Sequence, residues 1–180
     1  MKLLNSQNLL LASLLGFSTL FASSYPLFQA QSEPKLSCQA TIDLVRYELS
    51  KKGFFVPVKN PPAGADGRPK LKIDKSTIRE NWYDYPTERT DAVIFVLGET
   101  VNLHNSPKYM ATLAGKIIAK CNNVGFVEFA DWWEGTAIIG YFPDNTVKEF
   151  AWPPSDSFTR TVKTLQGERT LYKWGYYESP

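Results

Sequence analysis

The chain has 180 residues, of which 43% are hydrophobic, 14% aromatic and 21% charged, a composition typical of a globular protein. Its 20 basic and 18 acidic side chains give a formal net charge of +2 without any long basic block, so we expect no nucleic-acid partner. One histidine and two cysteines cannot supply a four-ligand Cys/His zinc site, a His-rich metal site or a four-thiolate iron–sulfur cluster. We therefore expect neither a metal ion nor a cofactor.

Residues 1–24 have the pattern of a cleaved signal peptide. Lys2 supplies a positive start, and the apolar segment from Leu9 to Ala22 is shorter than the roughly 20 residues of a membrane-spanning helix. Small side chains stand at the −3 and −1 positions of a cleavage site before Tyr25. We expect an exported protein, periplasmic or extracellular, whose mature form does not span a membrane; an uncleaved anchor is the alternative. The lack of any Asn-x-Ser/Thr sequence favours a bacterial envelope.

The two cysteines, Cys38 and Cys121, allow a single pairing. Export would place them in an oxidising compartment, where such pairs form disulfide bonds. Neither has a neighbouring histidine or a CxxC partner that would lower its thiol pKa. We therefore predict a structural disulfide, with a buried pair of free thiols or a redox site as the alternatives.

After a flexible lead over residues 25–36, we expect a single folded domain over residues 37–180. Two helices are predicted in it. The first ends at Gly53 and carries an apolar stripe at helical spacing, formed by Cys38, Ile42, Val45 and Leu49. The second is capped by Ser106, continues through Pro107, and carries the stripe Met110, Leu113, Ala114, Ile117, Ile118 and Cys121.

Strands are predicted where apolar and β-branched residues cluster between turns: Phe54 to Val58, Lys70 to Asp74, Ala92 to Leu97, Val124 to Trp133, Thr136 to Phe142 and Val147 to Trp152. Residues 92–97 are continuously apolar, which favours a central strand covered on both faces. The last two strands form a hairpin. Residues 75–89 and the tail from Phe158 to Tyr177 have no clear assignment.

The predicted disulfide would join the start of the first helix to the end of the second. Because the two Cα atoms of a disulfide lie within about 7 Å, the helices must then run antiparallel and side by side. Together with the strands, this arrangement predicts an α+β fold: two amphipathic helices packed on one face of a mostly antiparallel sheet of five or six strands.

No GxSxG elbow, Walker loop, GxGxxG turn or HExxH pair is present, so no common catalytic motif indicates an enzyme. His104 lies just before the second helix, but no partner is fixed by its spacing, and a solvated loop histidine is the alternative. The densest polar and aromatic cluster is residues 128–135. Its Asp131 and Glu134, together with Glu99, are the candidate carboxylates for glycoside hydrolysis.

The aromatic residues suggest binding. Trp132 and Trp133 would point to opposite faces of a strand, so one would meet solvent and could stack on a sugar ring. In the tail, the even-numbered Trp174 and Tyr176 would share a strand face with Tyr172. We name Trp132, Trp133, Trp174 and Tyr176 as candidate binding residues. The alternative is that these side chains fill the core or cover a sheet.

These features favour an exported, non-enzymatic binding or interaction module that contacts an envelope glycan or a protein partner through exposed aromatic side chains. The alternatives are a small secreted glycoside hydrolase that uses paired carboxylates and a structural subunit of an envelope assembly. The polar segment 81–91 is either a recognition loop or a solvated connection. The ligand and the oligomeric state are left open by the sequence.

Mass spectrometry of the exported protein tests the expected compartment. We expect a chain that starts at Tyr25 and whose cysteines resist alkylation until a reductant is added, because export leads to both signal cleavage and oxidation. An intact N-terminus together with two freely alkylatable thiols would contradict export.

Overall fold

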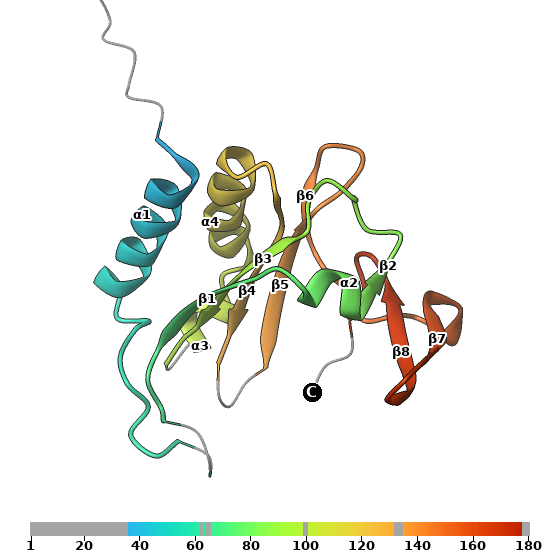
Figure 1. The fold of residues 1–180 in the computed structure, drawn as a ribbon. Helices are drawn as coiled ribbons and strands as arrows, with labels where there is room; N and C mark the ends of the chain where they lie inside the picture. Colours follow the sequence, from blue (N-terminus) through green and yellow to red (C-terminus); the bar gives the residue numbers. More distant parts are fainter. Residues whose placement is uncertain (1–35, 62, 64–65, 99–100, 132–134, 178–180) are drawn as a thin grey trace, which may run out of the picture. The chain divides into compact units, whose positions relative to one another are not determined.

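The computed structural model describes residues 36–61, 63, 66–98, 101–131 and 135–177. In these ranges the helices are α1 (Cys38–Lys51), α2 (Thr77–Asn81), α3 (Val101–His104) and α4 (Pro107–Lys120), with a 3₁₀ turn, η1 (Asp156–Phe158). The strands are β1 (Lys70–Asp74), β2 (Trp82–Tyr83), β3 (Asp91–Val96), β4 (Val124–Ala130), β5 (Thr136–Tyr141), β6 (Val147–Glu149), β7 (Thr159–Thr164) and β8 (Gly167–Lys173) (Figure 1). The predicted signal peptide and nearly all of the predicted lead lie outside the described residues.

The strands form two sheets. The larger sheet has the order β1-β3-β4-β5-β6, in which β3 and β4 are parallel and the other neighbours are antiparallel. A parallel pair needs a crossover, and α3 and α4 supply it. The smaller sheet has the order β2-β8-β7, with β2 parallel to β8 and β7 antiparallel to it. The predicted α+β class is confirmed.

Local signals in the sequence determine both ends of α1. The Ser37 side chain accepts a hydrogen bond from the Ala40 N–H (3.2 Å) and caps the first turn. At the other end Gly53 has a φ of 84°, and its N–H donates to the Ser50 carbonyl (2.9 Å). The Phe54 N–H donates to the Leu49 carbonyl (3.1 Å), which completes a Schellman motif that only a left-handed residue permits.

The predicted disulfide is present and fixes the orientation of the two long helices. Cys38 and Cys121 are bonded, with their Cα atoms 4.8 Å apart and a sequence separation of 83 residues. Further along, Lys116 Nζ lies 2.8 Å from Glu48 Oε1, which joins the last part of α1 to the middle of α4. The start of α1 therefore lies at the end of α4, and the helices run antiparallel, as the disulfide geometry requires.

Arg89 holds the end of α4 to the sheet. Its Nη1 lies within 3.0–3.2 Å of the carbonyl oxygens of Ile118, Cys121 and Val124. Its guanidinium carbon lies 3.9 Å from the centre of the Tyr141 ring. Carbonyls at a helix C-terminus lack partners within the helix, so a guanidinium placed there satisfies them and stabilises the turn into β4.

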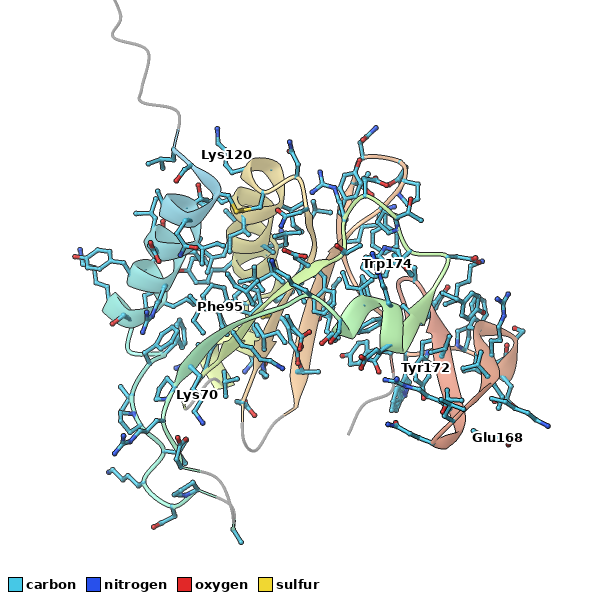
Figure 2. All side chains as sticks on the ribbon, in the orientation of Figure 1. Lys70, Phe95, Lys120, Glu168, Tyr172 and Trp174 are labelled. Carbon is cyan, nitrogen blue, oxygen red and sulfur yellow. A yellow bond between two sulfur atoms is a disulfide. The ribbon has the colours of Figure 1, made fainter. Side chains whose placement is uncertain are left out.

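The larger sheet is covered on both faces. On what we call the helix face, α1, α3 and α4 enclose the larger core, which includes Val45, Ile117, Phe95 and Phe129. On the opposite face, which we call the second face, a smaller and more aromatic core joins the sheet to α2, β2 and the C-terminal segment. Figure 2 labels Phe95 in the first of these cores and Trp174 in the second.

The strand predicted over Phe54 to Val58 is wrong. The Phe54 carbonyl accepts a hydrogen bond from the Gly98 N–H, while the Val58 N–H donates to the Gly67 carbonyl, both at 2.9 Å. These bonds lead to two different segments and not to one neighbouring strand, and Pro57 has no N–H to extend either of them. The segment is thus an irregular connection that packs its phenylalanines against the helix-face core.

Other elements were not predicted. They are the short helices α2 and α3 and the whole smaller sheet, which is built from residues 82–83 and 159–173. At Ser106 the helix begins as predicted, but the hydroxyl donates to the Asn102 carbonyl (2.9 Å) and does not cap α4. Among the described helices, none has both the length and the apolar character needed to cross a membrane.

Removing the disulfide should destabilise the fold strongly. Replacing both Cys38 and Cys121 by serine opens a loop of 83 residues, for which the chain-entropy relation gives a loss of about 4.5 kcal/mol in the free energy of unfolding. Urea denaturation of the variant and of the oxidised protein measures this loss. The reduced protein is the control and should match the variant; a loss under about 1 kcal/mol would contradict the prediction.

Candidate functional site

Glu128 stands on β4, the middle strand of the larger sheet. Side chains alternate along a strand, so Glu128 shares the second face with Phe126, while Val127 belongs to the helix-face core. The residues paired with Glu128 in register are Ile94 on β3 and Ile138 on β5. A carboxylate therefore lies between two branched apolar side chains, at a position where an apolar residue would be usual.

One hydroxyl supports this carboxylate. The Thr136 side chain donates a hydrogen bond to Glu128 Oε1 at 2.9 Å. Lys72 on β1 is paired in register with Ile94, but its ammonium nitrogen lies 2.7 Å from Asp74 Oδ2. Within the described part of the chain, Glu128 therefore forms no ion pair.

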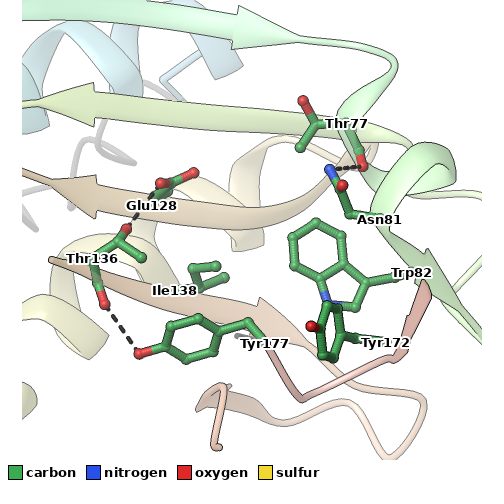
Figure 3. A pocket seen from close by; sticks show the side chains of 8 residues that line it. All are labelled: Thr77, Asn81, Trp82, Glu128, Thr136, Ile138, Tyr172 and Tyr177. Carbon is green, nitrogen blue, oxygen red and sulfur yellow. Dashed lines mark hydrogen bonds between the residues drawn. The ribbon is translucent and has the colours of Figure 1, made fainter. Parts of the chain in front are cut away.

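A groove of about 250 Å³ opens beside Glu128 (Figure 3). Its lining comes from five elements and the C-terminal segment: Thr77 and Asn81 of α2, Trp82 of β2, Glu128 of β4, Thr136 and Ile138 of β5, Tyr172 of β8, and Tyr177. Figure 3 shows Glu128 and Trp82 on opposite sides of Ile138. The groove thus has aromatic walls, an apolar floor and a carboxylate at one side.

Contacts within the protein fix the walls of this groove. The Trp82 indole packs against Phe126 and Trp174, with ring centres 5.2 and 6.0 Å apart. Four side-chain donors that line the groove already form hydrogen bonds within the protein. Trp82 Nε1 donates to the Tyr176 carbonyl (2.6 Å), and Tyr177 Oη donates to the Thr136 carbonyl (3.1 Å). Asn81 Nδ2 donates to the Thr77 carbonyl (2.9 Å), and Thr136 Oγ1 donates to Glu128. The groove is therefore shaped before any ligand arrives.

Burial shifts the acid–base behaviour of two lining groups. Desolvation raises the pKa of Glu128 above its ordinary value of 4.5, and the Thr136 hydrogen bond and the charge of Lys72 offset only part of that shift. Desolvation also raises the pKa of the Tyr177 phenol, with smaller contributions from Glu149 and Glu128. A carboxyl group with a raised pKa in a groove is typical of a functional site.

The fold brings together two other residues that the sequence suggested, His104 and Asp131. His104 Nδ1 lies 3.6 Å from Asp131 Oδ2, and Nε2 lies 3.4 Å from the Phe129 carbonyl oxygen. The Asp131 side chain is 2% exposed. Both ring nitrogens face acceptors of the protein itself, so the pair ties α3 to the end of β4 and directs neither nitrogen to a substrate.

The tail residues proposed for binding lie at or next to the second-face core. Trp174 is 5% exposed, and its indole N–H donates to the Tyr141 carbonyl at 2.8 Å. Tyr176 is half-buried and packs on Phe158, with 4.4 Å between the ring centres. In this arrangement Trp174 fills the core, which is the alternative that the sequence left open. The other candidates, Glu99, Trp132, Trp133 and Glu134, lie outside the described residues.

Sequence reasoning pointed to residues 128–135 but not to Glu128 itself. The available signal was alternation: on β4, Val127 and Phe129 face the helices, Phe126 and Glu128 face away from them, and Glu128 is the one charged residue of the strand. Trp82 and Asn81 lie in residues 75–89, for which the sequence predicted no helix or strand. Their position depends on pairing between β2 and β8, which no local pattern predicts.

No group of three or more His, Cys, Asp or Glu side chains in the described ranges is arranged to hold a metal ion. In comparisons with protein-family models, with curated proteins and with solved structures, nothing matched this chain. The geometry of the groove is therefore the basis for a functional proposal.

Replacing Glu128 by glutamine should stabilise the protein in a pH-dependent manner. Because its pKa is raised in the folded state, the ionised carboxylate disfavours folding above that pKa, and this cost disappears below its ordinary pKa of 4.5. We expect Glu128→Gln to raise Tm at neutral pH and to leave Tm unchanged well below pH 4.5. Thermal unfolding across pH measures this effect, and Glu149→Gln on β6 is the exposed control. A lower Tm for Glu128→Gln at neutral pH would contradict the prediction.

Proposed function

We propose that this protein is an exported, non-catalytic binding module and that the groove beside Glu128 holds the recognised group. The observation that carries the proposal is the combination of three aromatic side chains, Trp82, Tyr172 and Tyr177, with a single carboxylate in one shaped groove. Concave sites with apolar walls and a few fixed polar groups are typical of ligand binding. Export is part of the proposal and is supported by the disulfide, which forms readily in an oxidising compartment.

Binding is favoured over glycoside hydrolysis by the number of carboxylates. Hydrolysis by the usual mechanism needs two carboxyl groups about 5 to 9.5 Å apart across the scissile bond. Among the described lining residues, Glu128 is the one carboxylate. Asp131 is enclosed beside His104 and does not line the groove. A glycan or a protein partner is compatible with a groove of this kind.

A fragment screen observed by protein NMR tests the proposed groove. We expect fragments that bind to shift the signals of groove residues, and Tyr177→Ala to weaken that binding about 10-fold because it removes one aromatic wall. The matched control is Tyr83→Ala, since Tyr83 contacts Arg160 (4.5 Å) and does not line the groove. This control should leave the affinity unchanged.

Two outcomes would contradict the proposed function. The first is a screen in which no fragment shifts the groove signals. The second is release of sugar from peptidoglycan or soluble glycans that is lost in an Asp131→Asn, Glu134→Gln double variant, because that result would show catalysis by the candidate carboxylates.

A further inference from the structure

We infer that the groove beside Glu128 takes a cationic side chain, lysine or arginine, of a protein or peptide partner. This inference rests on the proposed function and names the ligand class of the same site. It is carried by the balance of charge, by the supply of hydrogen-bond donors and acceptors, and by the shape of the groove.

Among the described residues Glu128 forms no ion pair, and Lys72 acts on it only through its charge at longer range. Lys72, the nearest cation along the sheet, is 2.7 Å from Asp74 Oδ2. On the α2 side, Arg169 Nη2 lies 3.5 Å from Glu80 Oε2 and donates to Asn81 Oδ1 at 3.2 Å. Both cations are thus already paired within the described ranges, and an incoming positive charge meets a carboxylate without an ion pair at one side of the groove.

Hydrogen-bonding capacity points to the same ligand. The side-chain donors of Trp82, Tyr177, Asn81 and Thr136 each already donate to an acceptor of the protein. The carboxylate of Glu128 accepts one hydrogen bond, from Thr136, which leaves most of its lone pairs available to a ligand. A group that donates hydrogen bonds and accepts none satisfies such a site, and ammonium and guanidinium are the side-chain groups of this kind that also carry a positive charge at every physiological pH.

The aromatic walls favour a cation as well. Trp82 and Tyr177 flank the groove across Ile138 from Glu128 (Figure 3). The faces of aromatic rings attract cations, and tryptophan attracts them most strongly. A cation in the groove would therefore lie close to both the carboxylate and aromatic side chains.

The size and the apolar floor of the groove favour a side chain over a sugar. Sites for drug-sized ligands have volumes of about 300 to 1,000 Å³, whereas this groove has about 250 Å³, enough for one side chain. Ile138 and the aromatic side chains that line the groove give an alkyl stem apolar contacts. Lysine and arginine carry such a stem behind the charge, whereas an amino sugar carries its ammonium directly on a polar ring.

The burial that raises the pKa of Glu128 is consistent with this role. The groups that act on Glu128 are Thr136 on β5, Lys72 on β1 and Tyr177 in the C-terminal segment. None of these removes the cost of burying the carboxylate. Residues that lower stability without a structural gain are expected at functional sites.

Isothermal titration of the exported, disulfide-bonded protein tests the inference. The probes are the acetyl-methylamide derivatives of lysine, of arginine and of Nε-acetyl-lysine, together with glucosamine and N-acetylglucosamine. We expect the lysine or arginine probe to bind at neutral pH, and the neutral Nε-acetyl-lysine probe to bind about 10-fold more weakly or not at all, because a charge-assisted hydrogen bond is lost.

Variants separate this inference from the proposed function. Glu128→Gln keeps the shape of the side chain and is expected to fold, so its affinity for the cationic probe should fall about 10-fold, while Tyr83→Ala should leave that affinity unchanged. The inference is overturned if Glu128→Gln binds the cationic probe as the wild type does, if the neutral probe binds equally well, or if glucosamine binds more tightly than lysine. In each of these cases, loss of binding in Tyr177→Ala would still support the groove as the binding site. Binding of no probe at all also overturns the cation assignment, and the fragment screen then decides the proposed function separately.

Discussion

The arrangement of this fold follows from the need to cover both faces of its central strands. Residues 92–97 are apolar at every position, so β3 cannot leave either face in water. The long helices α1 and α4 cover one face and are held together by the disulfide. The other face is covered by short elements that come from distant parts of the chain. This second cover is less regular than a helix layer, and the groove beside Glu128 lies where it meets the sheet.

In the proposed function, stability and ligand binding oppose each other at a single residue, Glu128. Desolvation raises the pKa of Glu128, so the carboxylate costs free energy in the folded state at neutral pH. The wall of the groove opposite Glu128 is held in place: Trp82 packs against three neighbouring aromatic rings and donates a hydrogen bond to the C-terminal segment. A groove that is already formed loses little entropy when a ligand binds, which favours recognition of a small group.

Local patterns predicted the parts of the fold that depend on local interactions. Both long helices, the strand at residues 92–97 and the hairpin of β5 and β6 were confirmed, because periodicity, caps and turn residues lie within a few positions of each other. The strand predicted at Phe54 was wrong, because β-branched and aromatic side chains there pack against a core without joining a ladder. The pairing of Trp82 with Tyr172 in the smaller sheet joins segments 90 residues apart in sequence, and no local signal contains it.

The sequence by itself determined the α+β class, the pairing of Cys38 with Cys121 and the antiparallel contact of two helices, since composition, helical spacing and a single possible sulfur pair are properties of the chain alone. Only the tertiary structure decided that Trp174 is buried and that Trp82, Tyr177 and Glu128 line one groove. The physical reason is that a side chain's environment depends on which distant segment covers it. Alternation determines the face on which Glu128 lies, but the segments that cover that face come from elsewhere in the chain.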